Sequence, residues 1–101
     1  MSIATQSSQD GTILTIKVVG RFDFKTHSDF RKAYESLATR AVHYIVDLSE
    51  VDYLDSSALG MLLLLKQHAG GDRASITLAN VRPEVAKILN VACFDKLFKV
   101  A

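Results

Sequence analysis

The sequence has few of the residues that build disulfides and metal sites. Its 101 residues include a single cysteine, Cys93, so an internal disulfide cannot form. The three histidines, at positions 27, 43 and 68, are far apart in the chain and lack the close spacing of a zinc-binding pair. The sequence therefore gives no local signal for a metal ion.

Nucleotide-binding and hydrolase motifs are missing as well. The chain contains neither a Gly-x-x-x-x-Gly-Lys loop nor a Gly-x-Gly-x-x-Gly turn, which are the common phosphate-binding patterns. Ser56 and Ser57 lack the flanking glycines of a hydrolase nucleophile elbow. We therefore expect a protein that is not an enzyme and that uses no cofactor.

Charge and hydrophobicity narrow the class of protein further. Lys and Arg total 12 and Asp and Glu total 11, and the basic residues form no stripe that would bind nucleic acid. The most hydrophobic run, residues 58–65, is much shorter than the ~20 residues of a membrane-spanning helix. Residues 1–6 do not have the pattern of a secretion signal. We expect a cytoplasmic protein that neither binds nucleic acid nor inserts into a membrane.

Length and composition predict one globular domain over residues 1–101. Apolar residues make up 49% of the chain and charged residues 23%, which is typical of a folded protein. A chain of this length forms one core but is too short for two ordinary domains. Cys93 has the apolar neighbours Val91, Ala92 and Phe94, so we expect it to be a buried, unreactive thiol.

Hydrophobic periodicity predicts a β-hairpin followed by a helix. Residues 3–8 and 12–19 flank a turn at residues 9–11, and the second segment alternates with the β-branched residues of a strand that Gly20 closes. From Ser28 to Arg40 apolar residues recur at spacings of three and four, as in an amphipathic helix. They are Phe30, Ala33, Tyr34, Leu37 and Ala38.

The remaining sequence alternates between strands and helices. Residues 43–48 and 75–79 are expected to be strands, and Pro83 is expected to open a helix. Between them, residues 56–68 form a helix that is apolar on nearly every side and so should be deeply packed. Residues 94–100 fit either a short strand or a helix. This order predicts an α/β domain with a mixed, mostly parallel sheet and three to four helices.

Polar residues gather between residues 47 and 60, where a strand ends, an acidic loop follows and a helix begins. Asp55 or Ser56 can cap that helix by accepting hydrogen bonds from its first turn, worth about 1 kcal/mol. A phosphate on a serine of the first turn would also be tolerated, because it meets the positive end of the helix. Helix-start physics alone favours the cap.

A second reading of this segment rests on its carboxylates. Asp47, Glu50, Asp52 and Asp55 suggest an aspartyl-phosphate receiver or a magnesium site, since carboxylates at strand ends can serve either purpose. A receiver also needs a second acidic cluster after its first strand, whereas this chain opens with a hairpin. We therefore expect a solvated loop here.

Two motifs make the sequence resemble the STAS domain, specifically the bacterial anti-sigma-factor antagonists. Residues 20–23, Gly-Arg-Phe-Asp, are similar to the family's Gly-x-hydrophobic-Asp after the opening hairpin. Residues 55–60, Asp-Ser-Ser-Ala-Leu-Gly, are similar to its Asp-Ser-Ser/Thr-Gly-Leu-Gly, with Ala58 in place of the first glycine. The resemblance covers essentially the whole chain and implies a STAS-type fold.

The resemblance also implies a phosphorylation-controlled partner switch in signal transduction and transcription regulation. Ser56 would be phosphorylated by a serine kinase that is itself the anti-sigma factor, and a serine phosphatase would reverse the reaction. Ser57 is the less favoured acceptor. The unphosphorylated form would hold the anti-sigma factor and so release the sigma factor. The implied partner-binding residues are Asp23, Asp55, Ser56, Ser57 and Ala58.

A different use of the same domain is a constitutive adaptor subunit of a membrane transporter complex. In that role Ser56 and Ser57 would serve only at the start of their helix.

Overall fold

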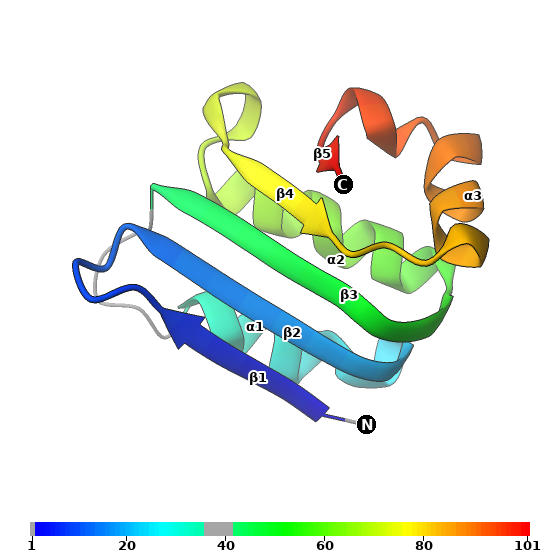
Figure 1. Ribbon diagram of the computed structural model, residues 1–101, viewed down its shortest axis with the longest axis horizontal. Coiled ribbons are helices and arrows are strands. Elements are labelled where there is room, and N and C mark those ends of the chain that lie inside the picture. The colour runs from blue at the N-terminus through cyan, green and yellow to red at the C-terminus, as the bar shows by residue number, and fades with distance from the viewer. Residues whose placement is uncertain (1, 36–41) are drawn as a thin grey trace.

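Among the residues that the structure describes, the strands form one five-stranded sheet, with α1 and α2 side by side behind it in the view of Figure 1. The computed structural model describes residues 2–35 and 42–101. The strands lie in the sheet in the same order as in the chain, β1-β2-β3-β4-β5. β1 is antiparallel to β2, and every later pair is parallel. The predicted mixed, mostly parallel α/β sheet is confirmed.

The opening hairpin consists of β1, Ser2–Ser7, and β2, Ile13–Phe22. Side chains of β2 alternate between the core and the open face of the sheet, and Leu14, Ile16 and Val18 are buried. We expected the strand to close at Gly20, but it continues to Phe22. Gly20 has φ +95°, a conformation that glycine adopts without strain, so the backbone passes it and stays paired with β3.

Strand β3, His43–Leu54, is twice as long as the segment expected from the sequence, which ended at Leu48. The expectation of an acidic loop after Leu48 is therefore wrong for residues 49–54, which belong to the strand. Lys17 pairs with Asp47 and Arg21 pairs with Tyr53, so β3 uses two residues more than β2 over the same span. These two β-bulges shift the side-chain alternation, and buried residues then occur at every third position.

Three α-helices complete the fold of the described residues, at the places that the sequence predicted. They are α1, His27–Glu35, α2, Ser56–His68, and α3, Pro83–Val91. In α1 the buried side chains are Phe30, Ala33 and Tyr34, as the periodicity indicated. Leu37 and Ala38, the last part of that predicted helix, lie outside the described residues.

Helix α2 is less deeply packed than its composition suggested. Met61, Leu62 and Leu65 are buried against the core, but Leu63 and Leu64 are 43% and 46% exposed. One side of α2 faces solvent, so the expected burial on nearly every side is wrong. None of the described helices is long and apolar enough to cross a membrane.

The C-terminal part contains β4, Ile76–Ala79, a 3-10 turn, η3, at Phe94–Lys96, and the short edge strand β5, Lys99–Val100. The segment left undecided between strand and helix thus contains one of each. Two further 3-10 turns, η1 and η2, span Phe24–Thr26 and Gly71–Arg73.

Cys93 is exposed, so the prediction of a buried thiol is wrong. It lies between α3 and η3 with φ +61°, in the left-handed region. In this turn it is the neighbouring Phe94 that enters the core, where its ring stacks on Phe98 with centroids 5.5 Å apart. The apolar residues around Cys93 therefore reflect the burial of Phe94.

Candidate functional site

The two family-like motifs meet at one end of the sheet, where the carboxyl ends of β2 and β3 lie. Phe22 and Leu54 are register partners on these parallel strands. Asp23 and Asp55 are the residues that follow them. The backbone N–H of Asp55 donates to the carbonyl oxygen of Phe22 at 3.4 Å, which ties the two chain segments together. Residues distant in sequence thus form one surface.

Both aspartates use their carboxylates to cap the structure that follows. Asp55 has an extended backbone, and its Oδ1 accepts a hydrogen bond from the N–H of Ala58 at 2.8 Å. Asp23 accepts one from the N–H of Lys25 at 3.1 Å and so begins η1. The capping role that the sequence left open between Asp55 and Ser56 belongs to Asp55.

Ser56 is the first residue of α2 and is exposed, while Ser57 is half-buried. Within residues 2–35 and 42–101 no hydrogen bond involves the Ser56 hydroxyl. This hydroxyl is therefore accessible, and the cap of α2 does not depend on it. Ser56 is thus open to chemical modification from solvent.

Ala58 occupies a different environment from its neighbours. It is completely buried in the hydrophobic core, and its N–H is the donor to Asp55. Its methyl group therefore has no surface to offer a partner, which removes Ala58 from the predicted contact residues. The alanine fits a position at which the helix packs closely onto the sheet.

Three further side chains, to which the sequence assigned no role of their own, lie beside the two aspartates. The guanidinium carbon of Arg21 is 4.2 Å from the centroid of the Tyr53 ring, within the range of a cation–π contact. Arg21 Nε is also 3.6 Å from Asp23 Oδ2. Phe24 is 64% exposed. Arg21 was visible within the first motif, but its contact with Tyr53 depends on the bulged register of β2 and β3.

A hollow of about 520 Å³ opens at this end of β2. Its lining residues share a position at the turn from the strand into η1, and they are Gly20, Arg21, Asp23, Phe24 and Lys25. The site therefore combines aromatic surface with both signs of charge.

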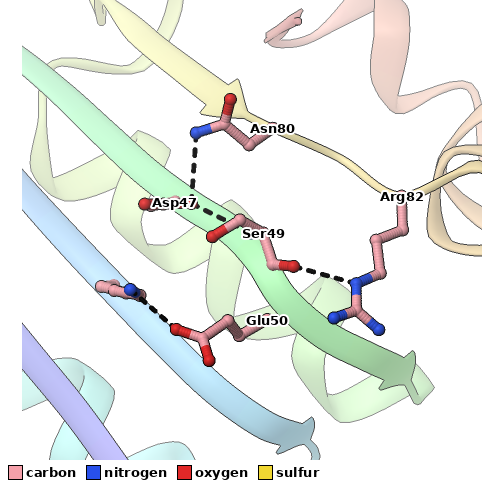
Figure 2. Close-up of polar contacts among 6 residues, drawn as sticks. Asp47, Ser49, Glu50, Asn80 and Arg82 are labelled. Carbon is pink, nitrogen blue, oxygen red and sulfur yellow. Dashed lines mark hydrogen bonds and ion pairs between the residues drawn. The ribbon is translucent and has the colours of Figure 1, made fainter.

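Asp47 and Glu50 do not join this site. Asp47 accepts hydrogen bonds from the N–H of Ser49 at 2.9 Å and from Asn80 Nδ2 at 3.4 Å (Figure 2). Arg82 Nε donates to the carbonyl oxygen of Ser49 at 2.9 Å. Partial burial opposes ionisation of Asp47, but the hydrogen bonds from Ser49 and Asn80 outweigh it and lower its pKa. Asp47 thus acts in a polar network between β3 and β4.

The other carboxylates of the acidic segment have separate surroundings. Glu50 forms an ion pair with Lys17, with Nζ and Oε2 2.7 Å apart, and Asp52 is exposed on β3. Asp55 caps α2. In the part of the chain that the structure describes, no three His, Cys, Asp or Glu residues converge as a metal site would require. The geometry gives no support to a receiver or a magnesium site.

Comparison with known proteins identifies the family. The profile described as "Mlab, STAS domain" matches residues 5–99. A STAS-domain containing protein of Pseudomonas aeruginosa (strain UCBPP-PA14) is 56% identical over 101 residues, which is 100% of both chains. The chain belongs to the STAS domain family, as the two motifs indicated.

Solved structures confirm the fold. The anti-sigma factor antagonist SpoIIAA in its unphosphorylated form superposes with a TM-score of 0.79 at 17% identity, over 99% of this chain and 88% of that one. A sulfate transporter family protein from Wolinella succinogenes gives a TM-score of 0.77 at 13% identity, over 91% and 74% of the two chains. At identities this low, the superpositions show a shared fold and nothing beyond it.

Proposed function

We propose that this STAS domain is an anti-sigma-factor antagonist whose binding to its partner is switched by phosphorylation of Ser56. The observation that carries the proposal is the separation of two tasks at the start of α2. Asp55 caps the helix, while the Ser56 hydroxyl is exposed and has no hydrogen bond among the described residues. SpoIIAA, which has the same fold, is known in unphosphorylated and phosphorylated forms.

The helix start explains how a phosphate would be carried without unfolding the domain. Backbone N–H groups of the first turn and the helix dipole both favour negative charge at this position. The fold of α2 would therefore survive the modification.

The same phosphate would change the surface strongly. It adds about −2 charge next to Asp55, at the same end of the sheet as Asp23. This concentration of negative charge would repel an acidic patch on a partner. It would also be left without a compensating arginine where the partner has none. Binding would therefore be lost while the domain remains folded.

The proposed partners follow from this role. The unphosphorylated domain binds a protein that is both anti-sigma factor and serine kinase, and a serine phosphatase restores that form. The domain itself acts without catalysis, in the cytoplasm. Asp23, Asp55, Ser56 and Ser57 contribute to the contact surface, together with Arg21, Phe24 and Tyr53 beside them.

The direct test is phosphorylation of purified protein by its cognate kinase and ATP, followed by native mass spectrometry. One phosphate is expected on the wild-type chain and on Ser57→Ala, and none on Ser56→Ala. The Ser57→Ala variant is the matched control, because it removes the neighbouring hydroxyl from the same helix turn. A phosphate that persists in Ser56→Ala would refute the assignment.

A constitutive adaptor role in a transporter complex is the second candidate, favoured by the similarity to the sulfate transporter family protein. In that role the domain would co-purify with a permease and an ATPase, and Ser56→Asp would leave the complex intact. Loss of the complex in Ser56→Asp would instead favour the switch.

A further inference from the structure

The two edges of the sheet differ in how they are protected from other chains. β5 forms one edge with only two residues, one of them the charged Lys99. β1 forms the other edge, and no strand among the described residues pairs with its outer side (Figure 1). Edge strands are usually protected by charge, proline, bulges or short length. β1 has six residues, no charge, no proline and an unbroken register with β2.

The hydrogen-bond alternation of the hairpin shows which backbone groups of β1 point outward. The N–H of Ser8 donates to the carbonyl oxygen of Ile13 at 2.9 Å, which sets the phase of the ladder. In an antiparallel pair the ladder bonds fall on alternate residues. Ala4 and Gln6 therefore bond to β2, while Ile3 and Thr5 direct their N–H and C=O groups away from the sheet.

A hollow of about 350 Å³ lies under this edge, between β1 and α1. Ile3 and Thr5, the residues on either side of Ala4, line it from the strand, and Asp29, Lys32 and Ala33 line it from the helix. Both charged residues are exposed, and neither forms an ion pair with another described residue. The edge thus offers hydrogen-bonding groups together with one unpaired charge of each sign.

We propose that this edge binds a second copy of the same chain, with the two β1 strands antiparallel about a two-fold axis at Ala4. The axis pairs Ile3 of each copy with Thr5 of the other, which joins their outward N–H and C=O groups. Ala4 then faces Ala4 across the close, non-hydrogen-bonded position, where small side chains fit. No like charges oppose each other in this register. The two sheets become one continuous sheet.

The charges of Asp29 and Lys32, beneath the β1 edge, favour pairing with a second copy over binding of an extended segment from an unrelated protein. α1 and β1 run in the same direction (Figure 1), so Asp29 precedes Lys32 along the hollow in the same sense as Ile3 precedes Thr5. A two-fold axis at Ala4 therefore places Asp29 of one copy opposite Lys32 of the other. A surface that is complementary to itself in this way is the mark of a symmetric dimer.

Ser56 stays accessible in such a dimer. It follows β3, which is separated from the outer edge of β1 by β2. The dimer would therefore present two copies of the proposed modification site, and the self-association stands or falls independently of the switch.

Sedimentation velocity over a concentration series, in reducing buffer because Cys93 is exposed, tests the proposal. The wild-type chain is expected to dimerise reversibly. Thr5→Pro removes an outward N–H without breaking the ladder to β2, and it should weaken the dimer about tenfold or more. Thr5→Val keeps the N–H and should dimerise like the wild type. Circular dichroism confirms that each variant is folded.

A charge swap tests the register. Asp29→Lys sets lysine against lysine across the axis and should weaken the dimer, and adding Lys32→Asp should restore it. Hydrogen exchange should slow at the amides of Ile3 and Thr5 as concentration rises, and that of Ala4 should not change. A chain that stays monomeric throughout, a Thr5→Pro variant that dimerises like Thr5→Val, or a charge swap without rescue would overturn the proposal. Binding only to an extended segment of another protein would do so too.

Discussion

The carboxylate of Asp55 is 2.8 Å from the backbone nitrogen of Ala58, and this hydrogen bond holds the first turn of α2 in place. Replacing Asp55 by alanine leaves that N–H without its partner and should lower the free energy of unfolding by about 1 kcal/mol. Urea denaturation monitored by circular dichroism measures the change. Ser56→Ala is the control at the next residue, and its stability should be close to that of the wild type. Equal losses in the two variants would show that Ser56 shares the cap.

Ser56→Asp separates binding from stability. A negative charge suits a helix N-terminus, so the melting temperature should change by no more than a few degrees. Affinity for the proposed anti-sigma-factor partner, measured by isothermal titration calorimetry, should fall. Ser56→Asn has a similar size without the charge and should retain more of the affinity. A large drop in melting temperature for Ser56→Asp would contradict the idea that the site tolerates a phosphate.

Leu62 and Leu63 are adjacent in α2 but face opposite environments. Leu62 is completely buried and Leu63 is 43% exposed. Leu62→Ala should cost about 2–5 kcal/mol of unfolding free energy because it leaves a cavity in the core. Leu63→Ala should change stability by roughly 0.5 kcal/mol or less, as is usual at a surface position. Guanidinium chloride unfolding distinguishes them, and similar values would mean that α2 is packed on both sides.

Asp10, in the turn between β1 and β2, should titrate at unusually low pH. The hydroxyl of Ser8 donates to its carboxylate at 2.7 Å, and the hydroxyl and N–H of Thr12 donate as well. These bonds lower its pKa to about 2, from a usual value of 3.8.

The sign of the resulting pH effect follows from linkage. Because the pKa is lower in the folded protein, the stabilisation is fully present above pH 3.8 and disappears as the pH falls toward 2. A carbon-detected NMR titration of the Asp10 carboxyl measures the midpoint directly. Ser8→Ala removes the largest of the three contributions and should move the midpoint upward. An unchanged midpoint in that variant would show that the turn is not closed by this bond.

The order of elements was predictable because each depends on a local signal. The hairpin and the helix with Phe30 and Tyr34 on its buried side carry a clear period of two or of three to four, and residues 43–48 form a short apolar run. Residues 55–60 were also found directly, since they form one continuous motif. Ser56 as phosphoacceptor remains a prediction that the phosphorylation experiment must decide.

What the sequence did not reveal depends on contacts between distant segments. The two bulges of β3 replace the alternation by a spacing of three, so residues 49–54 did not resemble a strand. The contact of Arg21 with Tyr53 follows from that register and from no local pattern. The exposure of Leu63 depends on which side of α2 the sheet covers, and hydrophobicity along the chain carries no such information.

The bulges of β3 also link chain length to the position of the helix start. Between the register pairs Lys17–Asp47 and Arg21–Tyr53, β3 contains two more residues than β2. Deleting one of them would turn every later side chain of the strand to the opposite face. It would also move Asp55 back by one residue from the end of the sheet where α2 begins. Substitutions within residues 48–53 are therefore easier for this domain to accommodate than single-residue insertions or deletions.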